Sequence, residues 1–230
     1  MAYVIKGDNK SLLIDCGVGL GNIREYIKTN LKLDIDTVLL THGHIDYIGG
    51  CSYFANVHMN KKDMDLFMSH YNKTMQKNHL RMNKVDPDVF VDSLYAPLDV
   101  PNFNYIGDTA FFDLGNISLE ITNVPSHTQG EIVIYVPEEK ILITGDACNN
   151  YIFMFSDNSC FVSDYKKNLE LLYKKYKGKF DRVLVSHEPG EEKVDLITNV
   201  INLCEDIIMN KCDDIEVSFF WKNSLYCEKN

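Results

Sequence analysis

Four of the seven histidines in this chain directly follow the carboxyl end of a predicted strand, and two aspartates occupy equivalent places. The histidines are His42, His44, His127 and His187, and the aspartates are Asp46 and Asp146. Sheet proteins collect their sites at the carboxyl ends of strands, where loops converge. Histidines scattered through a core would not repeat this placement, so we interpret the six residues as parts of one site.

Imidazole nitrogens and carboxylate oxygens together are ligands for a borderline metal ion such as zinc. In His42-Gly-His44, alternate residues of an extended segment can reach one ion from the same side. Asp46 points the same way but lies further along the chain, so we expect it at a neighbouring ion. Asp146 has two oxygens and is the candidate to bridge two ions about 3.5–4 Å apart. We therefore expect zinc as the cofactor, with two ions favoured and iron or manganese as alternatives.

Short strands alternate with helical patterns, and each candidate ligand follows one of the strands. Strands are predicted over 3–5, 11–16, 36–41, 56–59, 110–113, 117–123, 132–136, 141–144 and 182–186, with a last strand pair over 216–227. Helices are predicted over 22–30, from 61 onward, over 164–177 and over 191–210. Strands interrupted by helices favour an α/β fold in which helices cover sheets.

Length and composition predict one domain over residues 1–230. Apolar residues make up 45% of the 230-residue chain and charged residues 24%, which is enough to bury a core and argues against disorder. The segment 69–104 breaks the alternation with a polar stretch and three prolines. We interpret it as a partly helical insertion that acts as a lid.

The charge balance and the cysteine pattern limit which binding partners and which cellular compartment we expect. Lysine and arginine number 23 against 33 acidic residues, and a net charge of −10 makes nucleic acid unlikely as a partner. No apolar run exceeds five residues and no signal-peptide core is present, so we expect no membrane association. The seven cysteines never form Cys-x-x-Cys, which is typical of reduced, packed thiols and a cytoplasmic protein.

Five motifs resemble, in order, those of the metallo-β-lactamase fold family. Thr41-His-Gly-His-Ile-Asp46 resembles its His-x-His-x-Asp-His signature, and Leu13-Ile-Asp-Cys-Gly17 resembles its opening strand. The other three are Val124-Pro-Ser-His-Thr-Gln-Gly130, Leu142-Ile-Thr-Gly-Asp146 and Ser186-His187-Glu-Pro-Gly190. The resemblance covers about residues 3–190, and the motif style is closest to lactonase-like and glyoxalase II-like members.

This resemblance implies a four-layer αββα metallo-β-lactamase sandwich with a metal cleft at one sheet edge. It implies that His42, His44 and His127 hold a first ion. It further implies that Asp46 and His187 hold a second ion, with Asp146 between the two.

Tyr47 departs from the family pattern, because most members carry a further second-ion histidine at its position. A neutral phenol, with a pKa of about 10, is a poor ligand. Three interpretations stay open. Asp46, Asp146, His187 and water hold the second ion; the site holds one ion only; or an ionised Tyr47 ligates, which would favour iron.

The resemblance predicts a metal-dependent hydrolase acting on a small-molecule ester, lactone or thioester through a metal-bound hydroxide. We expect Asp46 to orient the nucleophile or pass a proton to the leaving group, and Tyr47 to donate a hydrogen bond to the substrate. The alternatives are a degenerate, non-catalytic metal or ligand binder and a phosphodiesterase of the same fold. The oligomeric state is left open.

Some residues near the motifs are interpreted as structural. Asp15 is expected to bond loop amides near the site, and Cys51 and Cys148 to pack. His58, His70 and His79 are expected to be ordinary polar side chains.

Overall fold

The computed structural model describes residues 1–154, 156–188, 190–211 and 224–227. The chain divides into two compact units. Unit 1 comprises Met1–Asp108 and Phe112–Ser118, and unit 2 comprises Thr109–Phe111 and Leu119–Asn230. The single domain expected over 1–230 stays a prediction. In the described ranges, no helix has both the length and the apolar character needed to cross a bilayer.

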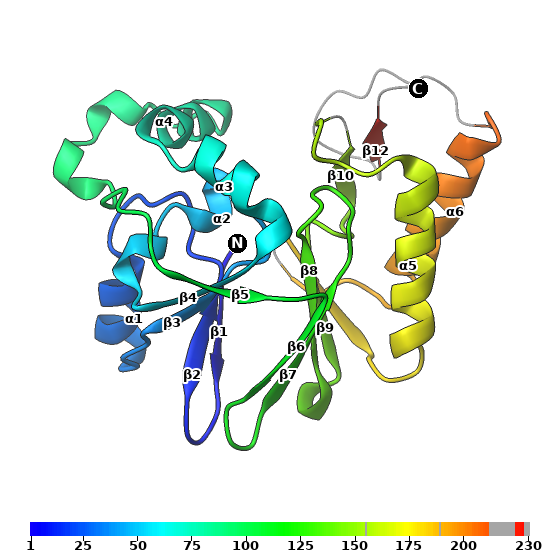
Figure 1. The fold of residues 1–230 in the computed structure, drawn as a ribbon, viewed down its shortest axis with the longest axis horizontal. Helices are drawn as coiled ribbons and strands as arrows, with labels where there is room; N and C mark the ends of the chain where they lie inside the picture. Colours follow the sequence, from blue (N-terminus) through cyan, green and yellow to red (C-terminus); the bar gives the residue numbers. More distant parts are fainter. Residues whose placement is uncertain (155, 189, 212–223, 228–230) are drawn as a thin grey trace. The chain divides into compact units, whose positions relative to one another are not determined.

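Unit 1 contains a five-stranded sheet with the order β1-β2-β3-β4-β5 (Figure 1). The strands are β1 Tyr3–Lys6, β2 Ser11–Ile14, β3 Thr37–Leu39, β4 Asn56–Asn60 and β5 Phe103–Ile106. Strands β1 and β2 are antiparallel, whereas the remaining neighbours run parallel. Parallel neighbours end at the same edge of a sheet, so the segments that follow β2 and β3 meet there.

Four α-helices accompany this sheet, and Figure 1 shows α3 and α4 gathered on the side away from the β1–β2 turn. They are α1 Ile23–Leu31, α2 Ile45–Ile48, α3 Met64–His70 and α4 Lys73–Met82, with 3₁₀ turns at Cys51–Tyr53, Lys61–Asp63, Pro87–Val89 and Asp92–Leu94. Asparagine caps begin α1 and α4, because the side chains of Asn22 and Asn72 accept hydrogen bonds from backbone amides of the first turn. The helices predicted over 22–30 and from 61 are confirmed.

The segment 69–104, expected as a partly helical insertion, contains α4 and two of the 3₁₀ turns. Its last two residues differ from that expectation, because Phe103 and Asn104 begin β5 and pair in parallel with β4. Prolines are typical of loops, so the prolines before Phe103 favoured the prediction of a loop over that of a strand. Gln76 of α4 is fully buried, and its amide donates a hydrogen bond to the carbonyl of Val18 at 3.1 Å. Helix α4 is therefore packed on the body of unit 1, and the lid role stays a prediction.

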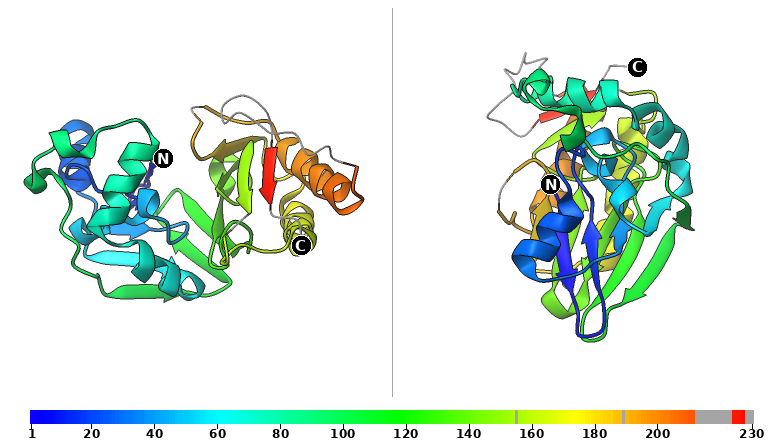
Figure 2. Two further views of the ribbon diagram at one scale, coloured as in Figure 1. Left: turned by 90° about the horizontal axis from the view of Figure 1, so that it is seen from above. Right: turned by 90° about the vertical axis from the view of Figure 1, so that its left-hand side faces the viewer.

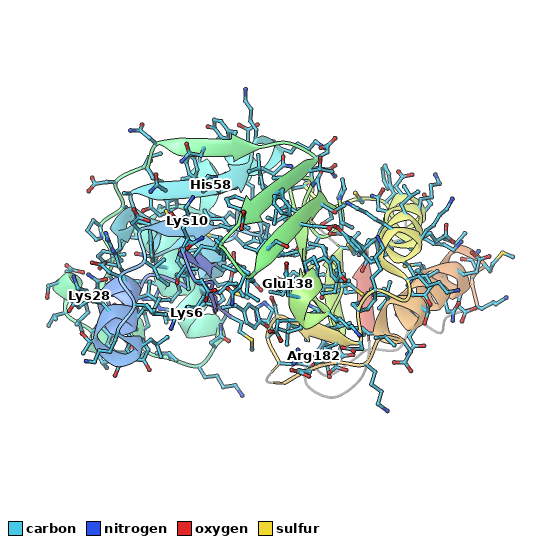
Figure 3. The ribbon with its side chains drawn as sticks, turned by 90° about the horizontal axis from the view of Figure 1, so that it is seen from below. Lys6, Lys10, Lys28, His58, Glu138 and Arg182 are labelled. Carbon is cyan, nitrogen blue, oxygen red and sulfur yellow. The ribbon has the colours of Figure 1, made fainter. Side chains whose placement is uncertain are left out.

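The second five-stranded sheet, with the order β11-β9-β8-β7-β6, lies mostly in unit 2, whereas the end of β6 and the first residue of β7 belong to unit 1. The strands are β6 Thr109–Asp113, β7 Ser118–Asn123, β8 Ile132–Val136, β9 Ile141–Gly145 and β11 Arg182–Val185. The hairpin predicted for 132–144 is confirmed, with antiparallel β8 and β9 joined by the 3₁₀ turn Pro137–Glu139. Strand β11 runs parallel to β9. Figure 3 shows Glu138 in the turn and Arg182 at the start of β11.

Two helices of unit 2, α5 Val162–Tyr176 and α6 Leu196–Ile208, lie side by side (Figures 1 and 2). They contribute to one apolar core with the sheet, through Tyr165, Leu169, Leu172, Ile197, Val200 and Cys204. Helix α6 begins later than the predicted residue 191, because Glu192 and Val183 exchange backbone hydrogen bonds of 2.8 and 3.2 Å. That pairing keeps the chain extended before the helix starts.

A separate two-stranded sheet joins β10 Tyr151–Met154 to β12 Ser224–Cys227 in parallel. Strand β12 supplies one strand of the pair predicted over 216–227, and residues 216–223 lie outside the described residues. Along β10 the side chains alternate. Ile152 and Met154 are buried in the core of unit 2, whereas Tyr151 and Phe153 are half-buried.

Candidate metal centre

The motif Thr41–Asp46 links β3 to α2 in unit 1. His42 is fully buried and His44 is half-buried, and their ring centroids lie 4.8 Å apart. His44 is the N-cap of α2 with an extended backbone, and Asp46 lies in the first turn of that helix. The structure therefore brings together the two imidazoles of the His-x-His pattern and places Asp46 two residues further on, in the first turn of α2.

Thr41 connects His42 to Asp15. The Thr41 hydroxyl lies 3.0 Å from both Asp15 carboxylate oxygens and 3.1 Å from Nδ1 of His42. A carboxylate only accepts, so the single hydroxyl proton goes to Asp15 and the hydroxyl oxygen accepts the Nδ1 proton of His42. Nε2 of His42 then carries a lone pair, which is the form that binds a metal ion. The structural role expected for Asp15 is confirmed.

Gly43 fits the motif loop closely against the start of α3. A Cβ atom at Gly43 would lie 2.9 Å from the amide nitrogen of Phe67 and 3.0 Å from the carbonyl oxygen of Asp63. The Gly43 amide donates a hydrogen bond of 3.0 Å to the Asp63 carboxylate, and Asp63 is fully buried. Asp63 thus holds the loop between the two motif histidines. No motif in the sequence marked this residue.

Tyr47 is fully buried in the apolar core of unit 1. Its ring centroid lies 4.1 Å from that of His42, with the two rings tilted by 48°. Its carbonyl accepts a backbone hydrogen bond of 2.8 Å from Cys16 on the loop after β2. Tyr47 therefore supports the His42 ring by packing, and the ligand and catalytic roles expected for it stay predictions.

Two histidines interpreted from the sequence as ordinary polar groups lie against the motif. The ring of His70, at the end of α3, is 4.8 Å from that of His44. Nδ1 of His79, on α4, is 3.9 Å from Oδ1 of Asp46. By contrast, His58 lies on β4 (Figure 3) and meets the ring of Phe112 edge-on. The sequence held no signal for His70 and His79, because long-range packing of α3 and α4 brings them there.

In unit 2, His127 lies on the loop after β7. Its Nδ1 is 2.5 Å from the backbone carbonyl oxygen of Phe153 on β10, and a carbonyl can only accept. The proton is therefore on Nδ1, and Nε2 carries the lone pair. Ser159 donates a hydrogen bond of 3.0 Å to the His127 carbonyl and fixes the loop. His127 thus adopts the same tautomer as His42.

Asp146 and His187, which follow β9 and β11, lie together in unit 2. Nε2 of His187 is 3.4 Å from Oδ2 of Asp146, and Oδ1 of Asp146 accepts a hydrogen bond of 3.1 Å from Asn149. The backbone of His187 is left-handed, with φ of 65°, a conformation that is uncommon outside glycine and gathers at functional sites. Asn149 orients the Asp146 carboxylate, and motif reading did not identify it.

The cysteines beside the motifs are packing groups. Cys51 and Cys148 are fully buried. Burial raises the pKa of the Cys51 thiol to about 12 and that of Cys148 well above its ordinary value. Thiols that stay protonated at neutral pH are poor nucleophiles and poor metal ligands. The packing role expected for both residues agrees with this burial.

A family model described as the metallo-beta-lactamase superfamily matches residues 1–187. Acyl-coenzyme A thioesterase MBLAC2 of Gallus gallus is 21% identical over 199 residues, which cover 80% of this chain and 71% of that protein. Hydroxyacylglutathione hydrolase GloC of Haemophilus influenzae is 27% identical over 146 residues, 60% of this chain and 61% of that protein. The chain thus spans less than two thirds of the second relative.

Solved structures of the same fold also match. The metallo-beta-lactamase from Pontibacter korlensis aligns with a TM-score of 0.62 at 19% identity, covering 88% of this chain and 86% of that one. A likeness at this identity concerns the fold alone. Together with the family match, it confirms the predicted fold class, the α/β metallo-β-lactamase fold.

Proposed function

The chain belongs to the metallo-beta-lactamase superfamily of metal-dependent hydrolases, and we propose that it cleaves a small ester, lactone or thioester. The observation that carries the proposal is that the His42 and His127 rings adopt the same tautomer. In each ring Nδ1 is held by a fixed oxygen acceptor, so that Nε2 carries the lone pair.

We propose that His42, His44 and His127 hold the first ion, since these three offer donor atoms suited to one metal. Asp46 and His187 would hold a second ion, with Asp146 shared between the two. The residues fit this role chemically, because imidazole nitrogens and carboxylate oxygens are the ligands that zinc takes in hydrolytic sites. The supporting contacts of Thr41 and Asn149 are the outer partners that such ligands require.

Bound zinc supplies Lewis acidity, which makes a nucleophile of water near neutral pH and polarises the substrate carbonyl. The chain's own groups supply orientation and proton handling. The Asp46 side chain is 15% exposed on the first turn of α2, where it can orient a water molecule and pass a proton to the leaving group. The Tyr47 ring packs against that of His42, and the hydrogen bond from its hydroxyl to the substrate stays a prediction.

Two observations support the substrate class. The first relative is a thioesterase by name, and the second acts on an acylated glutathione by name. In β10, Tyr151 and Phe153 are half-buried beside the His127 contact, and such aromatic side chains are suited to an apolar acyl group.

A substrate panel with zinc-, manganese- or iron-loaded protein tests this proposal. It contains a short acyl thioester, an aryl ester, a lactone and an aryl phosphodiester. We expect turnover of the ester-type substrates that falls at least about 100-fold in His42→Ala. The matched variant His58→Ala should keep its turnover. Ester-type rates no higher than those of His42→Ala would refute the proposal, and turnover of the phosphodiester alone would favour a phosphodiesterase.

A further inference from the structure

The family pattern places a histidine next to Asp46 in the sequence, but this chain has Tyr47, whose ring is buried under His42. A histidine from another element lies at Asp46 instead. Nδ1 of His79, on α4, is 3.9 Å from Oδ1 of Asp46, and the His79 side chain is 26% exposed. Both residues belong to unit 1. The geometry points to His79 as the imidazole ligand that, together with Asp46, binds the second ion in place of the absent histidine.

The separation of the two atoms suits a shared ion better than a direct contact. Two ligand atoms, each about 2.1 Å from one tetrahedral zinc, lie about 3.4 Å apart. The observed 3.9 Å exceeds this by roughly the movement that a small side-chain rotation provides, and it is longer than a hydrogen bond. Nδ1 is the nitrogen that faces Asp46, so the ion would bind at Nδ1.

Asn83, at the carboxyl end of α4, is placed to support this role. Its side-chain nitrogen is 3.1 Å from Nε2 of His79 and donates a hydrogen bond of 2.9 Å to the His79 carbonyl. When the ion occupies Nδ1, the ring proton lies on Nε2. As the structure stands, Nε2 accepts from the Asn83 amide and the ring proton is on Nδ1, so metal binding would displace that proton. The Asn83 amide would then flip to present its oxygen to Nε2, giving up its hydrogen bond to the His79 carbonyl. Metal-bound histidines characteristically have such a partner on the second nitrogen.

The position of α4 is determined by packing. Gln76, one turn before His79, is fully buried and donates a hydrogen bond to the Val18 carbonyl. A Cβ atom at Gly19 would lie 2.7 Å from that Gln76 nitrogen, so the loop after β2 and α4 approach each other closely. This contact holds His79 over the first turn of α2. The segment 69–104 would thus contribute a metal ligand, in addition to the lid role predicted for it.

The inference rests on the proposed metal site, and metal counting separates the two. The full-length protein is stripped with a chelator, reloaded with zinc or cobalt and desalted, and metal per chain is measured by mass spectrometry. We expect two equivalents in the wild type, one in His79→Gln and two in the matched variant His58→Gln. The cobalt spectrum of His79→Gln should lose one of two ligand-field components.

Every other result of the metal count leads to a single conclusion. Two equivalents in His79→Gln, or one in the wild type, would overturn the role of His79 and leave the hydrolase proposal standing. No bound metal in the wild type would refute both. Should His79→Gln fail to fold by circular dichroism, nitrogen NMR of the wild-type His79 ring decides. A zinc-induced shift at Nδ1 supports ligation, and an unchanged Nδ1 resonance overturns it.

Discussion

Asp15 accepts hydrogen bonds from both the backbone amide and the side-chain hydroxyl of Thr41, at 2.8 and 3.0 Å. Asp15 adopts a left-handed backbone, with φ of 58°, directly after β2. The strained turn and the paired hydrogen bonds join the ends of two parallel strands. This link determines the tautomer of His42, because the Thr41 hydroxyl is left with only its oxygen to offer the ring.

Thr41→Val should weaken zinc binding about 10–100-fold with little change in fold, because outer-shell partners of ligating histidines contribute that much affinity. Competition with a chromophoric chelator measures the dissociation constant. Thr37→Val is the matched control, since Thr37 lies on the adjoining strand β3 and its hydroxyl donates a hydrogen bond to the exposed Asp36. Equal zinc affinity in the two variants would show that Thr41 does not orient His42.

Gly43→Ala should lower the free energy of unfolding by roughly 1–3 kcal/mol, because the added methyl group overlaps the backbone of Phe67 and Asp63. Urea denaturation of the metal-free protein measures the change without a contribution from metal binding. Gly107→Ala is the control, because a Cβ atom there would meet nothing within 4 Å. A loss equal to that of the control would mean that the motif loop accommodates a side chain.

Stability should fall as the pH rises from about 9 to 12. The folded state keeps the Cys51 thiol protonated up to a pKa of about 12, whereas the unfolded chain releases this proton near 9.0. Above pH 9 the folded state binds more protons than the unfolded state, so the free energy of unfolding decreases, by at most about 1.4 kcal/mol per pH unit and thiol. Cys51→Ala should flatten the slope measured by denaturation at several pH values. An unchanged slope would contradict a protonated thiol.

Motif spacing predicted the His-x-His pair, Asp15 and the strands that carry them, because these features are local. Parallel pairing brings the ends of neighbouring strands together. The contact of Asp15 with the loop after β3 could therefore be predicted without knowing how the helices pack. The neighbours of Asp146 show the limit of that reasoning. Asn149 lies three residues away in a tight turn, and only the turn's conformation directs its amide to the carboxylate.

His70, His79 and Asp63 could not be predicted, because their places depend on how α3 and α4 pack on the sheet. Nothing in the local pattern distinguishes His79 from His58. In the structure, His79 stands on α4, which the buried Gln76 anchors, whereas His58 stands on a strand against Phe112. Strand β5 was missed for a related reason, since prolines before Phe103 are typical of loops and only pairing with β4 makes the segment a strand.

The acceptor that holds His127 belongs to the main chain of Phe153, not to its side chain. Replacement of this phenylalanine by another residue leaves the carbonyl in place. Mutation at position 153 can therefore change the side chain of the proposed acyl-binding wall while His127 keeps its proton on Nδ1. Under the proposed function, substrate preference could therefore change during evolution through position 153 without loss of the proposed first-ion site.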